Sequence, residues 1–261
     1  MENELEKFWE DFYSLTKEPR RIYRGMSDIS FELIPSIGRK TEKGTQSNIE
    51  GLEESLLEEF KKISLSQLDI IPDNVFEWLF LAQHYGLPTR LLDWSLNPLV
   101  ALYFAIFEND DKDGNLYSTQ VPISNQYDLF NYKTADYTDE HKKTPIGIFS
   151  MQPNQGNVIF IEPKYTDSRY VNQKSIFSCS RNPFEPLKLE KSQELKINKE
   201  LKSLLRDRLK IMGISHSYLF PNLDGICKEI KIGKFDPIAN GKATHVICKS
   251  APLDISEYMK S

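Results

Sequence analysis

The sequence predicts an α+β fold in a single domain. Hydrophobic residues make up 39% of the 261 residues and aromatic residues 11%, which is enough for a large packed core. Segments with helical periodicity are interspersed with short apolar runs of the kind that form strands. No internal repeat and no linker-like segment divides the chain, so we expect one domain over residues 1–261.

The helices are predicted from apolar residues that recur every three or four positions. This pattern occupies residues 2–16, 48–64, 72–86 and 199–215. A further helix is expected to begin at Pro98, because proline favours the first helical position and Asn97 before it can cap the helix.

The strands are predicted from short runs rich in β-branched and aromatic residues. We expect them within residues 21–27, 88–95, 156–163, 173–180 and 244–250. Residues 109–145 are polar and rich in turn formers, which indicates an insertion or a mobile loop.

Composition excludes several classes of protein. The net charge of −5 argues against broad nucleic-acid binding, which needs a basic face. The N-terminus is acidic and lacks the apolar core of an export signal, and no apolar run is long enough to span a membrane. Three cysteines without metal-site spacing are typical of a reducing compartment. We therefore expect a cytoplasmic protein with no membrane partner and no bound metal.

The densest group of candidate site residues lies within an apolar stretch, "WLFLAQHYGLPTRLLDWSLNPLVALYFA", residues 78–105. His84 and Tyr85 stand at a predicted helix end, and Arg90 and Asp93 lie in the following strand. A spacing of three places Arg90 and Asp93 on opposite faces of a strand, so each is expected to have a different partner. The network either lines a cleft or fixes the fold without doing chemistry.

Two further segments offer polar side chains at element ends. In Tyr23–Arg24–Gly25, the arginine fork suits a phosphate group and the glycine allows close approach of a backbone. The alternative for Arg24 is an ordinary structural ion pair. In "SRYVNQKSIFSCS", residues 168–180, Gln173 and Ser175 are predicted on one strand face with Arg169 nearby, where Gln173 either orients a ligand or simply faces solvent.

Four blocks of the sequence resemble the FRG domain, named for a Phe-Arg-Gly motif in which Tyr23 here replaces the phenylalanine. They are "YRGMSDISFELIPSIGR", "WLFLAQHYGLPTRLLDWSLNPLVALYFA", "RYVNQKSIFS" and "LFPNLDGI". The resemblance runs from about residue 21 to residue 230 and implies that this is the domain core. It also implies a bacterial-type cytoplasmic protein with a role in toxin or anti-phage systems.

A second resemblance is to arginine-class ADP-ribosyltransferases. Arg24–Gly25 is similar to the Arg-Gly of their early strand, Asp93–Trp94–Ser95 lies at their Ser-Thr-Ser strand, and Gln173 stands first in the third motif. Ser175 then occupies the position of the catalytic glutamate. This resemblance implies a central, mostly antiparallel split sheet with flanking helices, and NAD as the substrate rather than a bound cofactor.

Two hypotheses follow for function. In the first, the protein is an ADP-ribosyltransferase-like enzyme or NAD glycohydrolase, with Arg24, His84, Asp93 and Gln173 as catalytic residues. The second is a non-catalytic domain that senses a nucleotide or a phage protein. A nuclease is disfavoured because clustered acids for metal ions are lacking. The ligand-binding residues implied by the first hypothesis are Tyr23, Gly25, Tyr85, Arg90, Trp94, Ser95 and Arg169.

Overall fold

The computed structural model describes residues 2–39, 49–73, 75–120, 129–130, 158–163, 168–180, 183–189 and 192–236. The chain divides into two compact units, Met1–Ile214 and Ser215–Ser261. The first unit contains the sheet and every candidate site residue.

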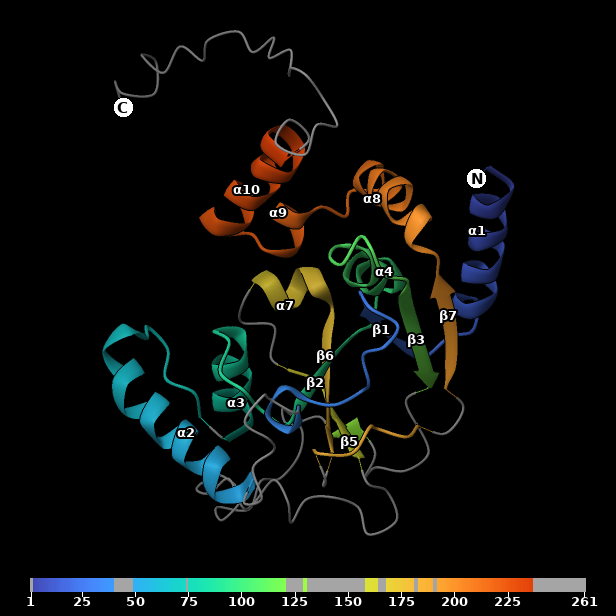
Figure 1. Ribbon diagram of the computed structural model, residues 1–261. Helices are drawn as coiled ribbons and strands as arrows, with labels where there is room; N and C mark the ends of the chain where they lie inside the picture. Colours follow the sequence, from blue (N-terminus) through green and yellow to red (C-terminus); the bar gives the residue numbers. More distant parts are fainter. Residues whose placement is uncertain are drawn as a thin grey trace, which may run out of the picture. The chain divides into compact units, whose positions relative to one another are not determined.

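The first unit is built on one seven-stranded sheet with the order β4-β5-β6-β2-β1-β3-β7 (Figure 1). All neighbouring strands are antiparallel except β4 and β5. The structure therefore confirms the prediction of an α+β fold with a mostly antiparallel sheet. The strands are β1 (Arg21–Met26), β2 (Leu91–Ser95), β3 (Gly114–Gln120), β4 (Leu129–Phe130), β5 (Val158–Ile161), β6 (Ser175–Ser180) and β7 (Gln193–Ile197).

The helices predicted from periodicity are confirmed. Asn97 caps α4 as expected, because its Oδ1 accepts a hydrogen bond from the Leu99 N–H at 2.9 Å. Gly86, after α3, has φ +90°, a conformation that favours glycine. The helices among the described residues of this unit are α1 (Glu2–Thr16), η1 (Ser36–Gly38), α2 (Ile49–Ser64), η2 (Leu65–Gln67), α3 (Val75–His84), α4 (Pro98–Ile106), α7 (Ser168–Gln173), η3 (Lys199–Leu201) and α8 (Lys202–Ile211).

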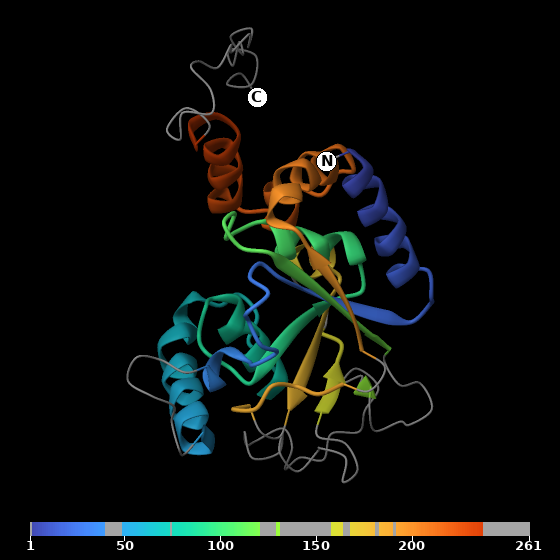
Figure 2. The same ribbon diagram turned by 45° about the vertical axis from the view of Figure 1, so that its right-hand side comes forward.

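Helices cover one face of the sheet, which we call the helix-covered face. Leu91, Phe177 and Cys179 pack there against α2 and α3 in one core cluster. On the β1–β3 half, α4 lies against Gly25, where an added Cβ would come within 1.9 Å of the Ala101 carbonyl oxygen. Figure 2 shows α2 and α3 together beside one half of the sheet and α4 with α8 beside the other.

Loop segments cover the opposite face, which we call the loop-covered face. Ile22, Leu92 and Trp94 point to this side because side chains alternate along a strand. They pack with Leu33 and Leu187, which come from two segments that lie far apart in the sequence. The Leu187 N–H donates to the Leu33 carbonyl at 3.0 Å and ties these segments together.

The sheet narrows at its centre, between β1 and β2. These strands pair at Tyr23 and Ser95, whereas β1 pairs with β3 over its whole length. The strands described here thus form one continuous sheet and not two separate ones, which corrects the expectation of a split sheet. The two halves nevertheless meet at a narrow contact, and Arg24 and Asp93 lie beside it.

Two predictions of local structure are wrong. The part of the segment 109–145 that forms β3 pairs on both sides, with β1 and β7, and is not a loop. Residues 121–128 and 131–145 of this segment lie outside the described residues. Gln173 ends α7 instead of starting a strand, because Lys174 adopts φ +48° and turns the chain before β6 begins. Gln173 therefore does not alternate with Ser175 on one strand.

The second unit contains α9 (His216–Leu219), α10 (Leu223–Ile230) and the π-helical turn η4 (Lys231–Phe235). α10 begins at Leu223, two residues after Pro221. Asn222 caps this helix by accepting from the Gly225 N–H at 2.8 Å. The predicted strand at 244–250 lies outside the described residues.

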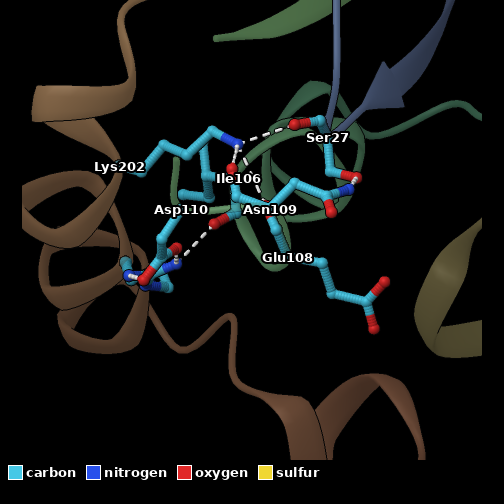
Figure 3. Close-up of polar contacts among 7 residues, drawn as sticks. Ser27, Ile106, Glu108, Asn109, Asp110 and Lys202 are labelled. Carbon is cyan, nitrogen blue, oxygen red and sulfur yellow. Dashed lines mark hydrogen bonds and ion pairs between the residues drawn. The ribbon is translucent and has the colours of Figure 1, made fainter. Parts of the chain in front are cut away.

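A buried lysine fixes the end of β1. Lys202, at the start of α8, is 1% exposed, and its Nζ donates to the carbonyl oxygens of Ser27, Glu108 and Asn109 at 2.7, 3.0 and 2.8 Å (Figure 3). Burial lowers the pKa of this ammonium, and Asp110 opposes the shift. An ammonium has three N–H donors, so the three carbonyls use all of them. The contact joins α8 to the ends of both α4 and β1.

Candidate functional site

Arg24 lies where β1 and β2 part. Its register partner on β3 is Tyr117, which places both side chains on the loop-covered face. The Arg24 Nη1 donates to the main-chain oxygen of Asp93 at 2.5 Å, just beyond the pairing of Tyr23 with Ser95. Arg24 is half-buried, and its Nε has no hydrogen-bond partner among the described residues. The guanidinium therefore keeps donor capacity for a ligand.

The Asp93 carboxylate is exposed and held from the helix-covered face. Gln83 of α3 donates from Nε2 to the Asp93 Oδ2 at 2.7 Å. Thr89 in turn donates through its hydroxyl to the Gln83 Oε1. Ser36 closes the network, since its Oγ accepts from the Thr89 N–H at 3.0 Å. The acid is thus oriented by three polar residues that come from α3, η1 and the start of the β2 segment.

Arg39 adds a second positive charge near Arg24. Burial is the main cause that lowers the pKa of the Arg24 guanidinium; Asp93 opposes the shift and Arg39 adds to it. Two cations near each other, one of them partly desolvated, disfavour the charged state. An anion bound between them would relieve this cost, which is the electrostatic property expected of a site for phosphate.

His84, Tyr85 and Arg169 gather at the C-terminal end of α3. Arg169 donates from Nη1 to the His84 carbonyl oxygen at 3.2 Å, so it satisfies a carbonyl at the helix end. The His84 ring packs edge-on against Tyr85 and Tyr170, with centroids 4.9 and 5.7 Å apart. Tyr85 is 71% exposed and is the accessible aromatic ring of this group.

Arg90 lies in the interior, away from solvent. It is fully buried, and its Nε donates to the Glu53 Oε2 at 2.5 Å, while its N–H donates to Oε1 at 3.1 Å. Glu53 is 3% exposed and belongs to α2. Arg90 therefore joins α2 to β2, and the ligand-binding role predicted for it gives way to a structural one.

Four other predicted ligand-binding residues are packed within the sheet. Tyr23 is buried, and burial raises the pKa of its hydroxyl. Gly25 allows the backbone of α4, and not that of a ligand, to approach β1. Trp94 is buried and donates from Nε1 to the Ser178 Oγ at 2.8 Å. Ser95 donates to the main-chain oxygen of Gln173 at 2.6 Å and holds the corner between α7 and β6.

Gln173 and Ser175 are both buried beside this corner. Gln173 is 9% exposed and Ser175 is 3% exposed. Ser175 pairs in register with Ser95 across β6 and β2. Ser175 thus places a small hydroxyl within the sheet beside this corner.

Four residues that complete the site were not predicted from the sequence: Ser36, Arg39, Gln83 and Thr89. Gln83 immediately precedes His84, but an uncharged glutamine within a helix is not by itself a sign of a functional site. Thr89 and Arg39 stand next to glycine- or proline-marked turns, where polar residues are common. Their roles depend on contacts between segments that are distant in the sequence, and periodicity cannot reveal such contacts.

The described residues contain neither a metal site nor a membrane-spanning helix. In the part of the chain that the structure covers, no group of three or more His, Cys, Asp or Glu side chains is arranged to hold a metal ion. Among the same residues, no helix is both long enough and apolar enough to cross a bilayer.

Comparison with known proteins gives one result. No curated protein and no solved structure matched the chain. The family model of the FRG domain matches residues 19–114, a range that includes Arg24, Arg39, Gln83 and Asp93. The chain therefore contains an FRG domain.

Proposed function

We propose that the protein binds NAD or a related nucleotide beside Arg24 and acts on it as an ADP-ribosyltransferase-like enzyme or NAD glycohydrolase. The observation that carries the proposal is the Arg24 guanidinium, half-buried at the narrow centre of the sheet, with Arg39 and the exposed Asp93 carboxylate both close enough to act on its pKa. A bound diphosphate would supply negative charge to balance the positive charges of these two arginines. Arginine is well suited to hold it, because its fork donates two parallel hydrogen bonds.

In this proposal Asp93 is the acid that serves the reaction. Cleavage of the nicotinamide–ribose bond sends the bonding electron pair to nicotinamide and leaves positive charge on the ribose, which water or an acceptor then attacks. A fixed carboxylate stabilises such developing charge. Asp93 is exposed and oriented by Gln83, so it is available for this role. The exposed Tyr85 ring offers a surface on which a base could stack.

The rival proposal is binding without turnover, and one observation favours it. The resemblance of the sequence to transferases places Ser175 at the position of their catalytic glutamate, and Ser175 is buried and paired with Ser95. If Asp93 does not replace that glutamate, the same arginines would hold a nucleotide that is never cleaved. The protein would then act as a sensor.

Release of nicotinamide from NAD by the purified protein distinguishes the two proposals. The enzyme proposal predicts release by wild type and by Arg208→Ala, an exposed arginine of α8, but not by Arg24→Ala or Asp93→Asn. Binding of NAD without release would favour the sensor. Equal release by Arg24→Ala and wild type would show that the reaction does not take place at this site.

The proposed place in toxin or anti-phage systems rests on the FRG domain alone. Induction of the protein in a bacterial host gives a direct test. Growth arrest by wild type that Arg24→Ala does not cause would support the role. Growth arrest by both wild type and Arg24→Ala would show that toxicity does not depend on this site.

A further inference from the structure

A pocket of about 490 Å³ lies on the loop-covered face, apart from the residues that hold Asp93. Its volume lies within the range of small-molecule sites. Three segments form it: the loop after β1, a part of β3 and the stretch that leads into β7. The lining residues used below are Phe31, Glu32, Leu33, Tyr117, Leu187 and Glu194.

The floor of the pocket is apolar and firmly held. Leu33 and Leu187 are 7% and 9% exposed, and both belong to the core cluster of this face. Tyr117 is packed against the same cluster. At the rim, Phe31 is 48% exposed and lines the pocket with its ring. An apolar ligand group of matching size could therefore contact two aromatic rings, Phe31 and Tyr117, and a floor of leucine side chains.

Two carboxylates give the pocket its charge. Glu32 and Glu194 line it from opposite segments, and among the described residues no ion pair joins either of them to a lysine or arginine. Asn115 holds Glu194 in place, since its Nδ2 donates to Oε2 at 2.9 Å. Lys188 also lines the pocket, so the lining carries two negative charges and one positive charge.

The two carboxylates act electrostatically on Tyr117, which lines the pocket. Burial is the main cause that raises the pKa of the Tyr117 hydroxyl, and both Glu194 and Glu32 raise it further, against the hydrogen bond with Asn115. Glu32 and Glu194 therefore line the same pocket as Tyr117 and both act on its hydroxyl. A cation above the Tyr117 ring would meet both carboxylates and the negative face of the ring.

We infer that this pocket binds a cation carried on an apolar body, an amine or guanidinium joined to an aromatic or aliphatic group. The apolar floor and Phe31 would take the body, and Glu32 and Glu194 would take the charge. The ligand is either a free amine or a basic side chain of another protein, which share this chemistry. The inference does not depend on nucleotide binding at Arg24.

Phenethylamine is a suitable probe, because it joins one ammonium to one aromatic ring. We would titrate it into the ¹⁵N-labelled full-length chain and follow the amide signals by NMR. Shifts are expected at Phe31, Leu33, Tyr117 and Leu187. The neutral analogue 2-phenylethanol should bind roughly tenfold more weakly, and 3-phenylpropionate should not bind, because each carboxylate is expected to contribute about two- to fivefold in Kd.

Variants test the charge directly. Glu32→Gln with Glu194→Gln should weaken phenethylamine binding roughly tenfold, whereas Glu185→Gln should not, since Glu185 is in the same segment as Leu187 but does not line the pocket. Glutamine at 194 can still accept from Asn115, so folding is expected to persist. Equal binding of amine and alcohol, an unchanged affinity in the double variant, or no binding at all would overturn the inference.

The source of the ligand is tested with the dipeptide amide Phe-Arg. Tighter binding of this peptide than of phenethylamine would support a basic side chain on a partner protein. Tighter binding of phenethylamine would support a free amine. Either result supports the inference only if the NMR shifts occur at the pocket residues. Shifts at other residues would contradict the proposed site.

Discussion

Arg90 and Asp93 lie three residues apart on one strand, yet they have different environments. Asp93 is exposed and Arg90 is fully buried against Glu53. Their opposite faces were predictable from spacing alone, and so was the fact that each has its own partner. The identity of the Arg90 partner could not be predicted, because Glu53 lies in a helix and precedes Arg90 by 37 residues. The sequence therefore placed Arg90 among ligand-binding residues, whereas its burial indicates a structural role.

The Arg90–Glu53 pair predicts a large loss of stability when one partner is removed. Arg90→Met should lower the free energy of unfolding by about 3–5 kcal/mol, because Glu53 is left as an uncompensated buried charge. Urea denaturation would measure this loss. The double variant Arg90→Met with Glu53→Met should recover most of it. A double variant as unstable as the single one would contradict the pairing.

Gly25 predicts a second effect at the scale of one residue. Alanine at this position would place a Cβ 1.9 Å from the Ala101 carbonyl oxygen and 2.5 Å from the Ala105 nitrogen, both of them backbone atoms of α4. Gly25→Ala should therefore destabilise the protein by roughly 3 kcal/mol. Gly233→Ala is the matched control, since nothing lies within 4 Å of an added Cβ there. A thermal melt in which both variants match wild type would contradict the close packing.

At the scale of elements, most of the fold was predictable, because its helices have clear periodicity and caps. The strand β3 could not be predicted, although it lies inside the sheet. Its Asn115, Ser118 and Thr119 are buried, and such residues read as a polar loop. They are tolerated because they have partners: the Ser118 Oγ accepts from the Arg21 Nε at 2.6 Å, and Asn115 donates to Glu194. Hydrophobicity cannot predict a strand whose burial depends on side-chain hydrogen bonds.

The junction of α4, α8 and β1 depends on Lys202. Lys202→Met keeps the length of the side chain but removes the donor to three main-chain oxygens. We expect a loss of roughly 2–4 kcal/mol in the free energy of unfolding. Lys7→Met on the exposed side of α1 should change it by less than about 0.5 kcal/mol. Equal stability of the two variants would show that Lys202 does not hold this junction.

The junction of β3 and β7 predicts a dependence on pH. Side-chain and backbone hydrogen bonds from Lys196 and Lys199 hold the pKa of the Asp113 carboxyl below its usual value of 3.8. The folded state therefore binds this proton less readily than the unfolded state. The stabilisation is present above pH 3.8 and is lost as the pH falls through the lowered pKa.

Asp113→Asn tests this dependence. The variant should be less stable than wild type near neutral pH, and the two should converge on acidification, when measured by urea unfolding from about pH 6 to about pH 2. A difference that stays constant over this range would contradict the assignment of the proton to Asp113.

At the scale of the whole molecule, the sheet brings together residues from separate parts of the FRG domain. β1 supplies Arg24, the segment after it supplies Arg39, α3 supplies Gln83 and β2 supplies Asp93. Two of these four were predicted from the sequence as site residues. The other two become part of the site only because β1 and β2 are neighbours in the sheet while α3 packs beside them.

The central proposal is that Arg24 anchors a nucleotide, and calorimetric titration with NAD tests it most directly. Wild type and Arg208→Ala should bind NAD with equal affinity, whereas Arg24→Ala should bind it roughly 10- to 100-fold more weakly, as expected for loss of a charge-assisted hydrogen bond. A thermal melt would first establish that Arg24→Ala is folded. Equal affinity of a folded Arg24→Ala and wild type, or no binding by either, would contradict the proposal.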